Sequence, residues 1–202
     1  KASRQWMRRH VRDTFVKASR QMNYRSRAAF KLIDIDSKHG LMKPGMRVVE
    51  IGSAPGSWTQ VIVRQVRSTS ASPTVVAVDV LKMKPVSGAV FVEGSILARK
   101  THEEIERALG GEKAGLVCSD AAPEFVGEGD ADQEATIQLN YAVLNSAVKY
   151  LKNGGNFLMK VMQGWIEKEM KVEIKRHFDS LSYVKPPASR ADSREIYILA
   201  KG

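Results

Sequence analysis

Residues 48–58 read VVEIGSAPGSW, a short apolar run with one acid followed by a turn that contains two glycines and a proline. Apolar runs of this length, bounded by turn residues, are typical of buried strands. A turn rich in glycine and proline lets the backbone approach a neighbouring group closely. The stretch therefore predicts a buried strand with a binding loop at its carboxyl end and a helix beyond it.

Apolar and helical patterns alternate outward from this stretch. The predicted strands lie at 47–51, 74–79, 89–94, 114–120, 155–162, 181–185 and 195–202, and the helical patterns cover 3–19, 25–40, 57–67, 101–110, 133–151 and 166–178. The NGG at 153–155 predicts a helix stop, and the acid-rich 123–134 and the proline-containing 184–195 predict loops, the first of them mobile. This alternation predicts an α/β fold whose largely parallel sheet carries helices on both faces. Ligands in such folds bind at the carboxyl ends of the strands.

The length and composition set limits on the class of protein. A chain of 202 residues fits one domain with a full core, so we expect residues 1–202 to form a single domain. The one cysteine excludes an internal disulfide, and with four scattered histidines it predicts no metal site. The apolar runs are too short to cross a membrane, and we expect a monomer with no membrane partner.

Positive charge is concentrated at the start of the chain. Residues 1–31 contain ten lysines and arginines and one acid, Asp13, whereas the remainder contains 22 basic and 21 acidic residues. A solvated basic helix, a remnant of a targeting sequence or a phosphate-binding arm for nucleic acid would each carry such a cluster. If the segment binds RNA, the candidate phosphate contacts are Arg4, Arg8, Arg9, Arg12, Arg25 and Arg27.

The turn at 52–56 differs from a dinucleotide-binding loop. In the G-x-G-x-x-G pattern the second and third glycines would fall on Ala54 and Ser57, and Pro55 lacks the N–H that a pyrophosphate could use. Asp79 ends the strand predicted at 74–79, where a carboxylate could accept hydrogen bonds from two ribose hydroxyls or could stabilise a turn. Together the turn and the acid favour a nucleoside-containing ligand without phosphates.

Lys160 interrupts an apolar strand near its carboxyl end. Burying an ammonium group without a partner is costly, although a lysine at a strand end can also extend its tip to water. Asp120 closes the strand predicted at 114–120 and could meet Lys160 at the same edge of the sheet. A lysine beside a carboxylate above a cofactor site could orient and deprotonate a hydroxyl.

At these residues the chain resembles the FtsJ/RrmJ-type ribose 2′-O-methyltransferases, from about residue 6 to residue 202. The matching stretches are RSRAAFKL (25–32), KPGMRVVEIGSAPGSW (43–58), VDVL (78–81), SDAAP (119–123), GGNFLMKVMQG (154–164) and SRADSREIYILAKG (189–202). The resemblance implies a Rossmann-like class I methyltransferase fold with a mostly parallel, seven-stranded sheet. It also implies S-adenosylmethionine as cofactor and RNA as substrate.

The resemblance also implies the site residues. A catalytic tetrad falls on Lys31, Asp120, Lys160 and Glu195. Lys160 would act as base or alkoxide stabiliser, and Asp120 would orient it. Lys31 and Glu195 would position the substrate hydroxyl. The implied cofactor residues are Gly52, Ala54, Pro55, Gly56, Ser57, Trp58, Asp79, Ser95 and Asp120; Gly56 would allow close approach to the ligand, and Trp58 would shape the pocket wall. Bacterial members have an aspartate after the glycine at the adenine site. Here Ser95 follows Gly94, so either Ser95 or Glu93 could contact the adenine.

The motif forms resemble the branch of the family that acts on large-subunit ribosomal RNA. They imply methylation of a uridine in the peptidyl-transferase A-loop during ribosome assembly, and residues 1–31 would deliver the RNA to Lys31. A transfer RNA 2′-O-methyltransferase and a non-catalytic RNA-binding assembly factor are the alternatives. The arginine-rich, acid-poor start, without an initiating methionine, favours a mitochondrial protein with its leader removed; a bacterial cytoplasmic protein is the alternative.

Overall fold

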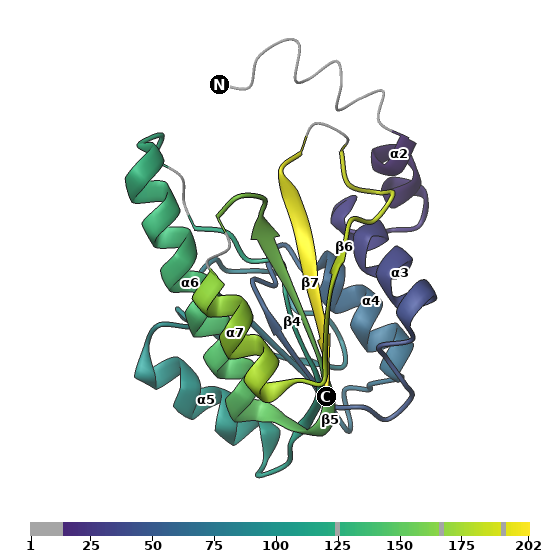
Figure 1. Ribbon diagram of the computed structural model, residues 1–202. Coiled ribbons are helices and arrows are strands. Elements are labelled where there is room, and N and C mark those ends of the chain that lie inside the picture. The colour runs from purple at the N-terminus through teal and green to yellow at the C-terminus, as the bar shows by residue number, and fades with distance from the viewer. Residues whose placement is uncertain (1–13, 124–125, 166–167, 191–192) are drawn as a thin grey trace.

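The computed structural model describes residues 14–123, 126–165, 168–190 and 193–202 (Figure 1). Within these residues, seven strands form one sheet in the order β3-β2-β1-β4-β5-β7-β6. The strands are β1 (Val48–Ile51), β2 (Val75–Asp79), β3 (Ala89–Glu93), β4 (Ala114–Ser119), β5 (Leu151–Met162), β6 (Ser180–Val184) and β7 (Glu195–Lys201). The helices are α2 (Thr14–Gln21), α3 (Ala28–His39), α4 (Ser57–Val66), α5 (Arg99–Leu109), α6 (Gly129–Tyr150) and α7 (Lys168–His177).

The sheet is mostly parallel. The strand β1 pairs in parallel with both β2 and β4, β2 with β3, and β4 with β5, whereas β7 runs antiparallel to β5 and β6. Ile51 lies beside Val78 on one side and Ser119 on the other, so three strands end at the same level. The strand order reverses between β1 and β4, which is where open α/β sheets bind their ligands.

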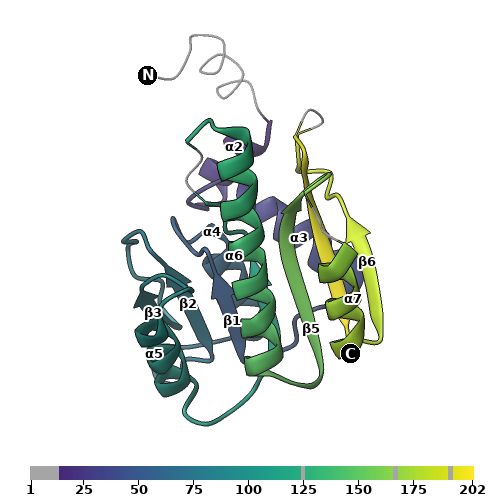
Figure 2. The same cartoon turned by 60° about the vertical axis from the view of Figure 1, so that its left-hand side comes forward.

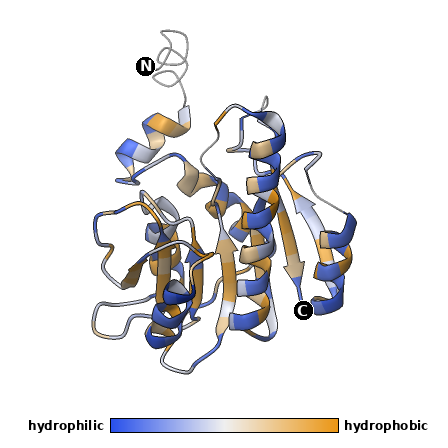
Figure 3. Ribbon diagram, turned by 90° about the vertical axis from the view of Figure 1, so that its left-hand side faces the viewer, coloured by the Kyte–Doolittle hydropathy of each residue, from blue (hydrophilic) through white to orange (hydrophobic). Residues whose placement is uncertain are grey.

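Helices cover both faces of the sheet (Figure 2). Leu32 and Ile35 of α3 and Ile62 of α4 pack in one cluster with alternate strand residues, and α5, α6 and α7 pack against the other face. The helices turn their hydrophilic sides to the solvent and their apolar sides to the strands (Figure 3). The strand–helix alternation therefore gives three layers, because α3 to α7 bury their apolar sides against the sheet.

All seven predicted strands are confirmed, and two details of the predictions are wrong. The helix α6 ends at Tyr150, and the NGG at 153–155 lies inside β5 instead of stopping the helix. The two glycines of this NGG lie where the pairing of β4 with β5 shifts register. Ala114 pairs with Leu151 and Leu116 pairs with Asn156, so a step of two residues along β4 corresponds to a step of five along β5. In addition, α6 begins at Gly129, so part of the predicted acidic loop is helical, and the Asp132 carboxylate accepts the N–H groups of Val126 and Gly127.

Other predictions about the chain fall only partly within the structure. Residues 1–13 lie outside the described residues, so α2 represents the end of the helix predicted at 3–19. The single domain over 1–202 stays a prediction for the same reason. Across the described ranges, no helix combines the length and apolar character needed to cross a membrane.

Candidate active site

A cleft of about 420 Å³ lies at the carboxyl ends of β1, β2 and β4. The predicted cofactor residues that line it are Gly52, Ala54, Asp79, Ser95 and Asp120. Its other walls are mostly apolar and come from Ile51, Val78, Val80, Leu81, Ile96, Leu97, Pro123 and Leu139. Among the described residues that line the cleft, none is lysine or arginine. The cleft therefore offers two carboxylates and apolar surface, which suits a ligand with positive charge and no phosphate.

The turn after β1 is held against the ends of β2 and β4. A side chain on Gly52 would place its Cβ 2.5 Å from the Cα of Ala121, and the φ of Gly52 is +78°, so only glycine fits there. The Ala54 N–H donates to Asp79 Oδ2 over 2.8 Å, and the Leu81 N–H donates to Asp79 Oδ1 over 2.8 Å. Each carboxylate oxygen of Asp79 keeps a second lone pair for a ligand hydroxyl.

Four of the implied cofactor residues are not among the residues that line the cleft. They are Pro55, Gly56, Ser57 and Trp58. Trp58 is 2% exposed; its indole N–H donates to the Ala28 carbonyl over 2.8 Å, and its ring lies 5.7 Å from that of Tyr197. The prediction that Trp58 shapes the pocket wall is therefore wrong, because the first turn of α4 directs the indole into the core beside α3.

The loop at 94–97 forms the far wall of the cleft. Ser95 lines the cleft, and its Oγ accepts the Leu97 N–H over 3.2 Å, whereas the alternative adenine contact, Glu93, is not among the lining residues. His102 of α5 supports this loop, with Nε2 2.8 Å from the Ile96 carbonyl and Nδ1 2.6 Å from the Tyr150 hydroxyl. A carbonyl only accepts, so Nε2 donates to it, and in the neutral imidazole Nδ1 accepts from the Tyr150 hydroxyl. No local pattern marks His102, because one of its two partners, Tyr150, is 48 residues away.

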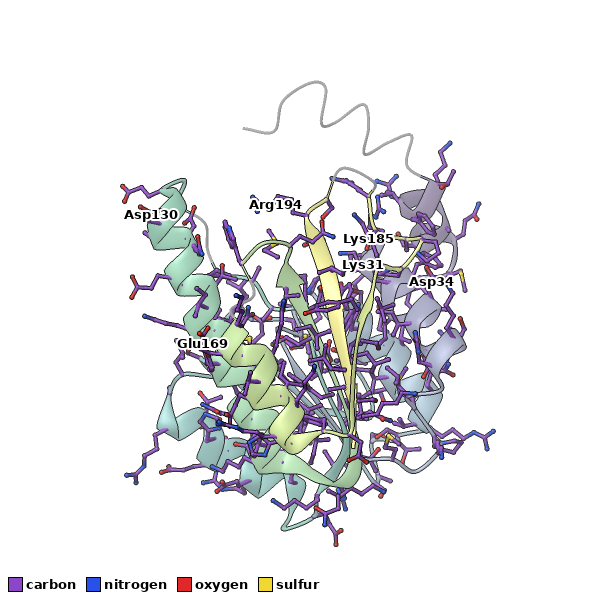
Figure 4. All side chains as sticks on the ribbon, viewed as in Figure 1. Lys31, Asp34, Asp130, Glu169, Lys185 and Arg194 are labelled. Atoms are coloured by element: carbon purple, nitrogen blue, oxygen red, sulfur yellow. The ribbon has the colours of Figure 1, made fainter. Side chains whose placement is uncertain are left out.

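The four residues of the implied tetrad come together at one edge of the cleft. The Nζ atom of Lys160 lies 3.4 Å from Asp120 Oδ1 and 3.5 Å from Glu195 Oε1, and it donates to the Asp120 carbonyl over 2.7 Å. Lys31 reaches Glu195 Oε2 from α3, 3.0 Å away. Figure 4 shows Lys31 at the same end of the sheet as Lys185 and Arg194. Three strands and a helix thus bring two ammonium groups and two carboxylates together in a largely buried cluster.

Electrostatic interactions keep Glu195 ionised. Burial alone would raise the pKa of Glu195, but the ammonium groups of Lys160 and Lys31 and the hydrogen bonds from Lys31 and Ser193 outweigh burial and lower that pKa below its usual value. A carboxylate that remains charged can hold both lysines in place. The sequence predicted these residues from the resemblance, and the structure brings them together.

Tyr197 is a member of the site that the sequence did not reveal. Its hydroxyl donates to Asp120 Oδ1 over 2.7 Å, and its ring is fully buried between Trp58 and the tetrad. Burial, together with the neighbouring Asp120 carboxylate, raises the pKa of Tyr197 well above its usual value. The phenol therefore stays protonated and fixes the orientation of Asp120. In the sequence this tyrosine looks like any other core residue of a strand.

A second cavity, of about 440 Å³, opens on the other side of the tetrad. It is lined by Ser26, Arg27, Ala28, Lys31, Met162, Arg190, Ser193 and Glu195. Burial and the positive charge of Arg190 lower the pKa of Arg27, whose Nη2 also donates to the Ala188 carbonyl. Arg190 was missed by the sequence reasoning, because an arginine in a polar loop is not unusual. The basic lining of this cavity suits an anionic ligand.

The other predicted phosphate contacts are not among the described residues that line this cavity. Arg4, Arg8, Arg9 and Arg12 lie outside the described residues. Arg25 does not line the basic cavity; its guanidinium instead donates to three backbone carbonyls. In the part of the chain that the structure describes, no three histidine, cysteine or acidic side chains are grouped as a metal site would need.

This arrangement, a cleft at the reversal point of a mostly parallel sheet with a polar cluster at its edge, defines a methyltransferase of Rossmann-like fold. The chain belongs to the FtsJ-like methyltransferase family, whose model matches residues 24–202. It is 42% identical over 200 residues to a ribosomal RNA large subunit methyltransferase E from Brucella ovis, which covers 99% of this chain and 83% of that protein.

Solved structures agree with this assignment. A ribosomal RNA methyltransferase from Plasmodium falciparum is 28% identical with a TM-score of 0.76, covering 89% of this chain and 98% of that one. A methyltransferase from Streptococcus mutans in complex with S-adenosylhomocysteine (SAH) has a TM-score of 0.52 over 84% of this chain and 94% of that one; at 10% identity it supports the fold alone.

S-adenosylmethionine is the cofactor of this family, and the cleft fits it. The apolar walls suit an adenine ring, and Asp79 has lone pairs for the two hydroxyls of a ribose. The positively charged sulfur and amino group of the cofactor would meet carboxylates and no basic side chain among the described lining residues.

Proposed function

We propose that this chain methylates a ribose 2′-oxygen in large-subunit ribosomal RNA, with a uridine of the A-loop as the target. The observation that carries the proposal is the position of Asp120. This residue lines the cofactor cleft and also contacts Lys160 of the tetrad, so a hydroxyl bound at Lys160 would lie next to the cofactor.

The side chains of the tetrad would prepare the hydroxyl for attack. When bound, S-adenosylmethionine supplies a methyl group carried on a positively charged sulfur. Lys160 Nζ is fixed by the Asp120 carbonyl and by two carboxylates, so it would hold the ribose hydroxyl and either take its proton or stabilise the negative charge on its oxygen. The oxygen would gain the methyl group and lose one proton, which would pass to Lys160 or to water. The bond between the methyl carbon and sulfur would break, and its electron pair would leave the sulfur uncharged.

The remaining tetrad residues would orient the ribose. Glu195 contacts both lysines, so it links the group that handles the proton to Lys31 on the side of the basic cavity. Positioning of this kind accounts for a large share of the rate acceleration in many enzymes.

Two observations favour RNA as the substrate. The basic cavity next to the tetrad contains Arg27, Lys31 and Arg190, a set of side chains suited to phosphate. The relatives from Brucella ovis and Plasmodium falciparum are both named as ribosomal RNA methyltransferases. The mitochondrial location stays a prediction, with the bacterial cytoplasm as its alternative.

The test is a methylation assay with tritiated S-adenosylmethionine. Deproteinised large-subunit RNA, assembling large subunits and transfer RNA are compared, with Lys160→Ala as the inactive control. We expect label in large-subunit RNA at one uridine, at a linkage that resists alkaline hydrolysis. Label in transfer RNA alone would support the transfer RNA alternative, label on a base would contradict the ribose target, and no label in any RNA would support a non-catalytic assembly factor.

A further inference from the structure

Arg25 connects two loops beside the cofactor cleft, the turn after β1 and the loop after β2. Its Nη1 donates to the Pro55 carbonyl over 2.9 Å and to the Lys84 carbonyl over 2.6 Å, and its Nη2 donates to the Pro85 carbonyl over 2.8 Å. Pro55 belongs to the turn after β1, and the two other carbonyls belong to the loop after β2. Both hydrogens of Nη1 are therefore used within the protein.

The guanidinium group occupies the space that Gly56 leaves open. A side chain at Gly56 would place its Cβ 2.5 Å from Arg25 Nη1 and 3.3 Å from the sulfur of Met83. The sequence predicted that this glycine lets a ligand approach the backbone closely. The structure shows instead that the close neighbour is an arginine of the protein itself.

Further contacts attach the segment around Arg25 to the start of α4. The Arg25 N–H donates to Gln60 Oε1 over 2.9 Å, and Gln60 Nε2 donates to the Asn23 carbonyl over 3.0 Å. The Ser26 hydroxyl donates to Ser57 Oγ over 2.8 Å. The backbone of Arg25 is therefore fixed, and its guanidinium has a defined position relative to the turn.

We propose that Arg25 is a positioning residue for the cofactor and not an RNA phosphate contact. On the cleft side, Asp79 joins the two loops through the N–H groups of Ala54 and Leu81; on the outer side, Arg25 joins them through their carbonyls. The spacing between Ala54 and Leu81, which both line the cleft, depends on both links. The planar fork of an arginine suits three fixed carbonyls, whereas a lysine presents a single point of charge.

The proposal rests on the proposed use of the cleft for S-adenosylmethionine, and it is tested with Arg25→Gln, Arg25→Lys and the control Arg20→Gln. Arg20 is an exposed arginine five positions earlier in the same basic segment, so its substitution matches the change in charge. Calorimetry measures the Kd of the cofactor, single-turnover assays measure the rate with both ligands saturating, and RNA binding is measured from low to high salt.

We expect Arg25→Gln to raise the Kd of the cofactor by about 10- to 100-fold, since two or more charge-assisted hydrogen bonds are lost. Arg25→Lys should recover part of this loss, and Arg20→Gln should keep the parental Kd. At saturating cofactor the Arg25→Gln rate should stay within about three-fold of the parent, because the loss is in binding. The dependence of RNA affinity on salt should not change for the Arg25 variants.

A second variant tests the same contact in case Arg25→Gln does not fold. Gly56→Ala keeps Arg25 but displaces its guanidinium, so it should also weaken cofactor binding, and the double variant should lose less than the sum of the two single losses. Additive losses would overturn the proposal. An Arg25→Gln variant with the parental Kd for the cofactor would also overturn it. So would a decrease of about 0.7–0.9 in the slope of log K against log salt for RNA binding, which is the value for one phosphate contact. If the parent itself fails to bind S-adenosylmethionine, the proposed function fails, and not the role of Arg25 alone.

Discussion

The two cavities that meet at the tetrad have opposite charge. The cofactor cleft presents Asp79 and Asp120 and no lysine or arginine among its described lining residues, whereas the second cavity presents Arg27, Lys31 and Arg190. A positively charged methyl donor and a negatively charged RNA would each be attracted to its own side. The comparison teaches that charge can direct the cofactor and the RNA to separate cavities. The two would meet only at the tetrad, where Lys160 Nζ lies 3.4 Å from Asp120 Oδ1.

The largest effect should come from the point where the two sides meet. Lys160→Ala should lower the single-turnover rate by about 10²- to 10⁴-fold and leave cofactor and RNA affinity within a few-fold of the parent, because the group acts on the reacting hydroxyl. Lys160→Arg should restore little, since a guanidinium is larger and remains protonated. A variant that kept more than about a tenth of the parental rate would remove Lys160 from the chemistry.

On the acidic side, Asp79→Ala should weaken binding of S-adenosylmethionine by about 10- to 100-fold. The substitution removes the acceptor for the Ala54 and Leu81 N–H groups as well as the proposed ribose contacts. Calorimetry measures this change, with Asp130→Asn as a control that alters an exposed acid at the start of α6. RNA affinity should not fall, and a loss on the RNA side would contradict the separation of the two cavities.

On the basic side, Arg190→Gln should act on RNA and not on the cofactor. If Arg190 meets one phosphate, the slope of log K against log salt should decrease by about 0.7–0.9, and affinity should drop several-fold. Arg176→Gln on α7 provides a control, because that arginine is exposed and lines neither of the two cavities. An equal change in both variants would mean that the effect reflects net charge alone.

A further comparison concerns two glutamates in different surroundings. Burial first, with Asp120 and Asp79 adding to it, raises the pKa of Glu50 under the cofactor turn to about 8, whereas the pKa of Glu195 is lowered. Because the folded-state pKa of Glu50 lies above its unfolded value, its contribution to stability is complete below about pH 4.5 and is lost as the pH rises to about 8.

Urea unfolding across this pH range measures the difference. The free energy of unfolding of Glu50→Gln should fall less with rising pH than that of the parent, since glutamine does not ionise. Parallel curves for the two proteins would show that Glu50 does not titrate in this way.

Local patterns in the sequence were sufficient for the sheet and for part of the site. Apolar runs marked all seven strands, and Lys160 stood out because a lysine in an apolar strand needs a partner. The resemblance to a known family then placed Lys31 and Glu195, which are 164 positions apart and which no local pattern could have joined.

Other assignments depended on which way a side chain points. Trp58 follows directly after the binding turn, yet the first turn of α4 sends it into the core. Arg25 resembles its neighbours in the basic segment, yet its guanidinium is used by three carbonyls. Tyr197 and Arg190 gave no signal, because their roles depend on partners far away in the chain.

The sequence by itself determined the α/β alternation, the turn at 52–56 and the acid at Asp79, because these follow from periodicity and from the backbone preferences of glycine and proline, which act over a few residues. Only the tertiary structure decided that Arg25 donates to the carbonyls of two loops and that Tyr197 donates to Asp120. It also decided that a cleft without basic residues among its described lining lies beside a basic cavity. Those relations depend on strand register and helix packing, which bring side chains together from distant parts of the chain.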